Sequence, residues 1–173
     1  MIFVMNFGRV QTTSAYEHYL QHVQQEFLIA ELREAGESLL NVCESITEEK
    51  AGTAYAEGKW TIKELIVHLI DSERVFCYRA MRFARNDRTE LPGFDHESYV
   101  PESFANERKL VNILDEFAHI RSATIGMFRG MNEEQLARTG VANGCTAGVE
   151  ELGFVIAGHQ RHHTIVLHEK YLT

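Results

Sequence analysis

Residues 60–69 read Trp-Thr-Ile-Lys-Glu-Leu-Ile-Val-His-Leu, and the pattern that starts here is the clearest in the chain. Thr61 and Glu64 have the spacing of a capping box, in which each side chain satisfies a backbone N–H at the start of a helix. The apolar side chains that follow lie within one arc about 60° wide on the surface of such a helix. They are Leu65, Leu69, Phe76, Ala80 and Phe83. The stretch therefore predicts an amphipathic helix.

Three further stretches show the helical period of apolar side chains, and each has a candidate N-cap. They run from Ser14, in a capping box with Glu17, to Val42, from Ser103 to Phe128, and from Thr146 to Tyr171. Residues 86–101 and 130–146 are predicted loops. Four such helices predict an all-α, four-helix bundle that occupies residues 1–173 as a single domain. The periodicity leaves the order of up and down helices open, because the loops are long enough for hairpins or crossovers.

The composition excludes several classes of protein. Of the 173 residues, 45% are hydrophobic and 24% are charged, which is typical of a globular domain. The net charge of −8 and the absence of a basic stripe argue against a nucleic-acid partner. No apolar run approaches the roughly 18 residues that span a membrane, and the start lacks the pattern of a signal peptide. Three distant cysteines without a CxxC pair fit a reducing cytoplasm.

The last predicted helix contains an unusual pair of histidines in the segment Gly158-His159-Gln160-Arg161-His162-His163. His159 and His163 are four residues apart, so their rings stack about 6 Å apart on one face of a helix. That face is the middle of the apolar arc. Each buried ring nitrogen needs a partner, and one divalent metal ion would satisfy both rings. Two packed core histidines remain the alternative.

A third metal ligand would have to come from another helix, and His68 is the best candidate. It flanks the apolar arc of its helix, where a residue can face a neighbouring helix. A histidine at that boundary that bonds a nearby carbonyl is the alternative. The remaining histidines of the helices are predicted to be exposed, although His162 in place of His163 would be another way to form a pair. The exposed ones are His18, His22, His119, His162 and His168.

Two familiar metal motifs do not fit this sequence. The segment from His159 to His163 lacks the Glu at its second position that HExxH metalloproteases use as a general base. Glu116 and His119 form an ExxH motif, but a di-iron bundle needs two such motifs that point inward. Here the single motif lies opposite the apolar arc of its helix.

Two other features have ordinary interpretations. Trp60 is predicted to pack at the start of its helix. Arginines recur every three residues in the series Arg79, Arg82, Arg85 and Arg88. Such a series is typical of a solvated helix face, and binding of an anion is the less favoured alternative.

Two motifs together resemble a known family. Residues 59–74 read Lys-Trp-Thr-Ile-Lys-Glu-Leu-Ile-Val-His-Leu-Ile-Asp-Ser-Glu-Arg, and residues 158–165 contain His-x-x-x-His. In this order and at this separation they resemble the DinB-like, or DinB/YfiT-like, metal-binding four-helix bundles. The resemblance covers nearly the whole chain.

The resemblance implies an up-down-down-up bundle with a long crossover between the second and third helices. It also implies one divalent metal ion, nickel or zinc in most members, held by His68, His159 and His163. Homodimers are common in the family, and characterised relatives include S-transferases that use a low-molecular-weight thiol. Nothing in the resemblance implies contact with DNA.

Three imidazoles leave at least one open position on a divalent metal ion. Our leading hypothesis is a metal-dependent transferase that activates a small thiol toward a small-molecule substrate, with residues 86–101 covering the site. A metal-dependent hydrolase is the alternative, although the sequence shows no convincing general base. A non-catalytic metal- or ligand-binding module and a plain helical bundle are further alternatives. Glu64, Asp71 or Glu73 is expected to orient His68, and catalytic residues are not predicted.

Overall fold

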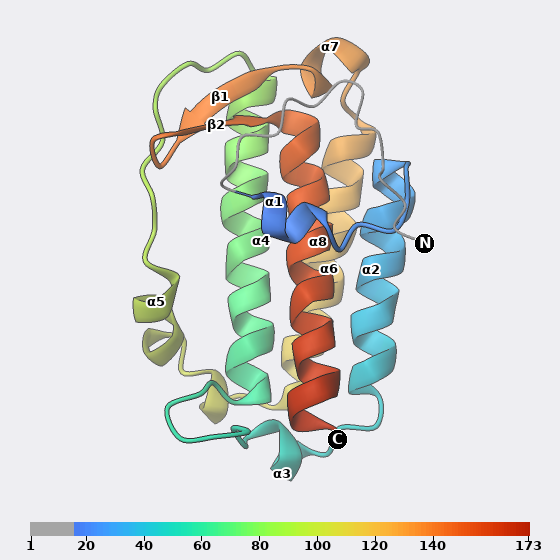
Figure 1. Ribbon diagram of the computed structural model, residues 1–173, viewed down its shortest axis with the longest axis vertical. Coiled ribbons are helices and arrows are strands. Elements are labelled where there is room, and N and C mark those ends of the chain that lie inside the picture. Colours follow the sequence, from blue (N-terminus) through green and yellow to red (C-terminus); the bar gives the residue numbers. More distant parts are fainter. Residues whose placement is uncertain (1–15) are drawn as a thin grey trace.

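The structure is a computed structural model that describes residues 16–173. Four long helices run along its longest axis, and short elements connect them (Figure 1). The long helices are α2 (Leu28–Cys43), α4 (Ile62–Ala84), α6 (Leu110–Arg129) and α8 (Val149–Val166). The short helices are α1 (Glu17–Leu20), α3 (Glu48–Ala51), α5 (His96–Glu102), a 3₁₀ turn (Ala105–Glu107) and α7 (Glu133–Leu136). The strands are β1 (Thr139–Ala142) and β2 (Cys145–Gly148), and a π-helical turn (Leu167–Tyr171) continues α8.

The four long helices form the predicted bundle with up-down-down-up order. α2 and α8 run in one direction, whereas α4 and α6 run in the other (Figure 1). Because α4 and α6 are parallel, the chain between them returns along the length of the bundle as the predicted crossover, on the outer side of α4 (Figure 1). α8 packs against both α2 and α4, so it forms the centre of the face drawn in Figure 1. Within residues 16–173, no helix combines the length and the hydropathy needed to cross a membrane.

The N-termini of α4 and α8 show one correct and one wrong prediction. The Thr61 hydroxyl accepts the Glu64 N–H at 3.2 Å and the Glu64 carboxylate accepts the Thr61 N–H at 2.8 Å, which confirms the capping box. Thr146 is not the N-cap of α8, because it lies in β2. The N-cap is Gly148, whose N–H donates to the Glu151 carboxylate at 2.9 Å.

The predicted continuous helix over residues 14–42 is wrong, and its proposed cap Ser14 lies outside the described residues. The chain forms the short α1, leaves the helical path at residues 21–27 and begins again as α2. Glu31 stabilises this break, because one of its carboxylate oxygens accepts two backbone N–H groups of the segment at 3.2 and 2.9 Å. The break allows α1 to turn across α8 instead of extending α2.

The crossover differs from the loop predicted over residues 86–101, because it contains α5. Asp95 caps α5 through its side chain. Ser103 is not the cap of the third long helix, since it follows the last turn of α5. α6 begins only at Leu110, where the Glu48 carboxylate accepts the first N–H at 2.9 Å.

Residues 130–146, predicted as a loop, contain α7 and most of a β-hairpin. The hairpin turns at Asn143 and Gly144, whose φ angles are 54° and 71°. Two positive φ values at an Asn-Gly pair are the preference of a two-residue hairpin turn. The hairpin packs on the end of α4 so closely that a Cβ at Gly140 would overlap the ring of Phe83.

A layer of buried polar side chains divides the core into two apolar clusters. α4 passes from one cluster to the other between Ile70 and Phe76, and α6 does so between Phe117 and Phe128. Polar groups occupy these intervals and the matching part of α8, and Glu31 of α2 pairs with one of them. They are Glu31, Glu73, Arg121, His159, Gln160 and Arg161. The polar layer therefore crosses the bundle at mid-height.

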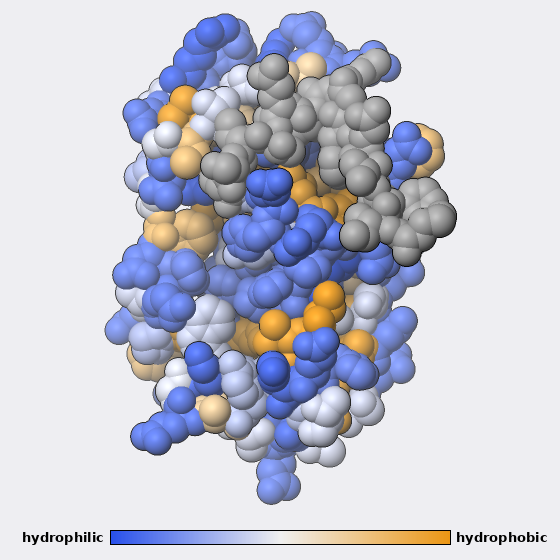
Figure 2. Space-filling model, in the orientation of Figure 1, coloured by the Kyte–Doolittle hydropathy of each residue, from blue (hydrophilic) through white to orange (hydrophobic). Residues whose placement is uncertain are grey.

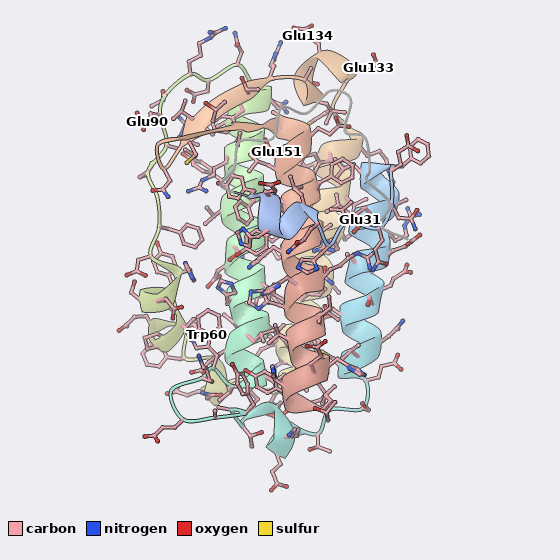
Figure 3. The ribbon with its side chains drawn as sticks, viewed as in Figure 1. Glu31, Trp60, Glu90, Glu133, Glu134 and Glu151 are labelled. Carbon is pink, nitrogen blue, oxygen red and sulfur yellow. The ribbon has the colours of Figure 1, made fainter. Side chains whose placement is uncertain are left out.

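Two buried ion pairs join the helices within this layer. The Arg121 guanidinium donates to both Glu73 carboxylate oxygens at 3.0 and 2.9 Å and to the Leu32 carbonyl at 2.7 Å. Arg161 of α8 donates to Glu31 of α2 at 2.5 and 3.2 Å. Figure 3 shows Glu31 between these two helices. The pairs fix which helices are neighbours.

Arg121→Ala is expected to destabilise the protein by about 3–5 kcal/mol, because it leaves the Glu73 carboxylate buried without its partner. Urea unfolding at neutral pH measures this change in the free energy of unfolding. A double variant, Glu73→Leu with Arg121→Leu, is expected to recover most of the loss, since no charge is left unpaired. A loss below about 1 kcal/mol for the single variant would contradict the structural role of the pair.

Candidate metal centre

α4 and α8 bring three histidines together at the polar layer. His159 and His163 lie one turn apart on α8, and His68 approaches them from α4. The Nε2 atoms of His68 and His159 are 3.1 Å apart. One ligand nitrogen from each ring lies within 4.8 Å of the other two. The structure thus brings together all three residues that the sequence analysis proposed as ligands.

In the described structure, the Nε2 atoms of His68 and His159 face each other at hydrogen-bond distance, and one nitrogen of His163 has no partner. His68 and His159 are 7% and 4% exposed. Among residues 16–173, the buried Nδ1 of His163 has no hydrogen-bond partner. Buried polar atoms are nearly always satisfied, so this arrangement fits a metal ion better than a packed core. The separation of 3.1 Å between the Nε2 atoms of His68 and His159 is close to the spacing of about 3.3 Å expected for two ligands of a tetrahedral zinc ion.

Burial also keeps the three imidazoles neutral, the form that binds metal ions. Desolvation lowers the pKa of His68 to about 4, and the nearby His96 lowers it further. Desolvation and the neighbouring histidines lower the pKa of His163 to about 3. The pKa of His159 is lowered well below its ordinary value, first by burial and then by His163 and His68. At neutral pH the cluster is therefore a set of uncharged donors.

Aromatic side chains from two other segments contact the cluster. The centroid of the Trp60 ring lies 4.7 Å from that of the His68 ring. The indole therefore packs against a proposed metal ligand, in addition to its place just before α4. Figure 3 shows Trp60 on the side of α4 that faces α5. Tyr19 of α1 lies 4.7 Å from the ring of His159. α1 reaches this position because a Gly at 158 leaves room for its backbone.

His96 of α5 is a candidate functional residue that the sequence analysis did not single out. Its ring centroid lies 5.4 Å from that of His68 and 6.4 Å from that of Trp60. The one sequence feature that could have indicated a role for His96 is its position among Phe94, Asp95 and Tyr99 in the crossover. The crossover therefore covers one side of the cluster, as predicted.

Two pockets reach the histidines from different directions. One of about 310 Å³ is lined by Trp60, His68 and His163. The other, of about 220 Å³, is lined by His68, His159 and Arg79. Tyr19 and His96 border both pockets, so these two side chains stand between them. Figure 2 shows hydrophilic residues at the middle of this face, around α1.

The carboxylates expected to orient His68 bind other groups instead. Glu64 belongs to the capping box, Glu73 to the ion pair with Arg121, and Asp71 accepts from Arg74 at 3.2 Å. None of the three hydrogen-bonds His68 in the described structure. That expectation is wrong, because each carboxylate has a nearer partner on its own helix or on α6.

The other histidines follow the predictions in part. His18, His119 and His168 are exposed as predicted. His22 and His162 are half-buried and pack together, with ring centroids 5.3 Å apart. The ExxH motif is not a metal site, since Glu116 binds Arg74 and Arg108 instead.

The cysteines lie outside the cluster. Burial raises the pKa of the Cys43 thiol to about 12 and that of Cys77 to about 11. Cys77 contacts the Thr124 hydroxyl at 3.2 Å. Both thiols are protonated at neutral pH, which argues against either one as a nucleophile.

The fold and the cluster define a four-helix bundle with a three-histidine centre, and comparison with known proteins identifies its family. The family model of the DinB superfamily matches residues 31–167, so the chain belongs to the DinB superfamily. A protein of Oceanobacillus iheyensis, named as a candidate metal-dependent hydrolase, is 26% identical over 124 residues, 69% of each chain. YfiT from Bacillus subtilis is described as a probable metal-dependent hydrolase with an unusual four-helix bundle topology. Its structure matches with a TM-score of 0.70 and 18% identity, over 90% of this chain and 86% of that one.

Proposed function

We propose that the protein is an enzyme that depends on one divalent metal ion held by His68, His159 and His163. The convergence of three neutral ring nitrogens at a point that two pockets reach supports this proposal. A divalent ion bound there would lower the pKa of an oxygen or sulfur ligand and polarise a substrate. Nickel and zinc both suit imidazole ligands.

A catalytic role is favoured over a purely structural one by the ligand count. Structural zinc sites are closed by four protein ligands, whereas catalytic sites keep one position open. Within residues 16–173, no fourth His, Cys, Asp or Glu joins the three histidines. The non-catalytic module of the sequence analysis is therefore the less favoured interpretation.

Thiol S-transfer is the reaction that the shape of the site favours. A transferase must hold two organic molecules at once, and the two pockets meet at His68. Trp60 and Tyr19 would exclude water from the place where the molecules meet. The thiol would be a small external molecule, since Cys43 and Cys77 stay protonated and no cysteine among residues 16–173 joins the cluster.

Hydrolysis is the second candidate, and His96 is the observation that favours it. A hydrolase needs a general base within hydrogen-bond reach of the attacking water, directly or through one more water. His96 borders both pockets and its side chain is 49% exposed, so both the pockets and the solvent reach it. The two relatives described above carry names that point to the same reaction class.

The test is a parallel assay of metal-free, zinc-loaded and nickel-loaded protein. One arm supplies a small thiol with an electrophilic acceptor, and the other supplies a panel of esters and amides. We expect metal-dependent turnover in one arm, lost in His159→Ala and kept when Cys43, Cys77 and Cys145 are all replaced by serine. A strong effect of His96→Gln on the hydrolytic arm alone would select the hydrolase.

Equal rates for metal-free, metal-loaded and His159→Ala protein in both arms would contradict the enzymatic proposal. Metal binding without turnover would leave the ligand-binding module. Small-molecule specificity and homodimerisation stay predictions that these assays and light scattering would test.

A further inference from the structure

Arg79 of α4 is buried, although the arginine series to which it belongs was predicted to be solvated. Its side chain is 4% exposed, whereas Arg85 and Arg88 of the same series are exposed. Arg82 pairs with Asp87 at the end of α4. Arg79 therefore differs from the rest of the series and needs its own explanation.

No carboxylate among residues 16–173 pairs with Arg79. The guanidinium donates to the Pro92 carbonyl at 3.0 Å and to the Tyr16 hydroxyl at 3.3 Å, and it lies 5.8 Å from the Phe94 ring centroid. These partners are all uncharged. A guanidinium has five N–H donors and stays charged at every physiological pH. These contacts therefore leave some N–H groups without an acceptor and the positive charge without a counter-ion.

The other two buried arginines each have a carboxylate that balances their charge. Arg121 binds Glu73 and Arg161 binds Glu31, each through two hydrogen bonds. A buried charge without such a partner is costly, so an anionic ligand that supplies the partner would offset that cost. In the described structure, Arg79 is thus the buried arginine that has no acidic partner.

Arg79 lines the smaller pocket at the histidine cluster. His68 and Arg79 lie on the same helix, with Cα atoms about 16 Å apart along its axis, and helical side chains lean back toward the N-terminus. Tyr16, His18, Ser72 and Asn143 also line the pocket, and among residues 16–173 no Asp or Glu does. The larger pocket, in contrast, includes Glu97. One pocket is therefore lined both by a buried cation and by two of the proposed metal ligands, His68 and His159.

We propose that this pocket binds a small substrate through an oxyanion, a carboxylate or a phosphate, which Arg79 holds while the reacting group faces His68 and His159. The inference rests on the proposed function for the reaction, and on Arg79 for the anion. A guanidinium donates two parallel N–H bonds to such a group. The Tyr16 hydroxyl accepts from Arg79 and keeps its own proton to donate. The volume of about 220 Å³ suits a small molecule, since drug-sized ligands need roughly 300 Å³ or more.

The experiment measures anion binding to metal-free protein, so its result does not depend on the metal. Propanoate and inorganic phosphate are titrated separately into ¹⁵N-labelled, chelator-treated protein, and the backbone amide resonances of the pocket residues Ser72 and Phe76, which the wild type and the variants share, are followed. We expect saturable binding of at least one anion, and its identity distinguishes a carboxylate from a phosphate substrate. Arg79→Met should weaken that binding about 10- to 100-fold, whereas the exposed control Arg85→Gln should not change it.

The melting temperature distinguishes an Arg79 that binds an anion from an Arg79 that stabilises the fold. If Arg79 serves a ligand, Arg79→Met keeps or raises the melting temperature in anion-free buffer, because an unpaired buried charge is removed. If Arg79→Met does not fold, Arg79→Lys takes its place. We expect Arg79→Lys to bind the anion more weakly than the wild type, because lysine lacks the planar pair of N–H donors of a guanidinium.

Absence of saturable binding to wild-type protein, or unchanged affinity in both Arg79 variants, would overturn the proposal. Failure of the wild-type protein to bind zinc or nickel would instead overturn the proposed function and leave the anion site standing.

Discussion

His163→Ala is expected to weaken binding of zinc or nickel by more than about 100-fold. Changes to groups that merely support metal ligands cost about 10–100-fold in affinity, and removal of a ligand should cost more. His163 is one of the three converging rings, and among residues 16–173 no fourth His, Cys, Asp or Glu joins the cluster to replace it. Competition against a chromophoric chelator measures the affinity, and metal analysis after dialysis measures the stoichiometry.

Two histidines on the same helix serve as matched controls. His168 is exposed beyond the end of α8, and His168→Ala should bind the metal ion as the wild type does. His162 adjoins His163 but is outside the converging cluster, so His162→Ala tests the alternative pair from the sequence analysis. Full stoichiometry in His163→Ala, or its loss in His162→Ala, would contradict the assignment of the ligands.

The parts of the site that could be predicted from the sequence depend on local spacing. The Thr61 and Glu64 capping box and the His159 and His163 pair each involve residues three or four apart, and a helix places such residues together whatever surrounds them. His68 was a good candidate only in combination with this pair. Its approach to α8 depends on the packing of the bundle, which the resemblance to the DinB-like family supplied.

What was missed depends on contacts between distant segments or on a local signal that was overlooked. The burial of Arg79 requires the crossover to fold back so that Pro92 accepts its N–H, and no helical period encodes that contact. Similarly, the break before α2 depends on Glu31, whose partner Arg161 lies 130 residues away. The hairpin was different, because Asn143-Gly144 is a recognised turn pair and could have been used.

The metal-free protein is expected to lose stability as the pH falls from about 6.5 to about 4. The pKa of His68 is about 4 in the folded protein, compared with an ordinary value of 6.5. In that interval the unfolded chain binds a proton that the folded chain does not, so the free energy of unfolding decreases with falling pH. A difference of 2.5 units corresponds to about 3 kcal/mol, and the lowered pKa values of His159 and His163 act in the same direction.

Urea unfolding of chelator-treated protein at several pH values between 7 and 4 measures this loss. His68→Gln removes one of the titrating groups and should flatten the profile by up to about 3 kcal/mol, whereas His168→Gln, at an exposed position, should leave it unchanged. Zinc should stabilise the protein at pH 7, and this gain should shrink in acid because protons compete for the imidazoles. A free energy of unfolding that stays constant from pH 7 to 4.5, or a His68→Gln profile that matches the wild type, would show that these histidines are not held neutral by burial.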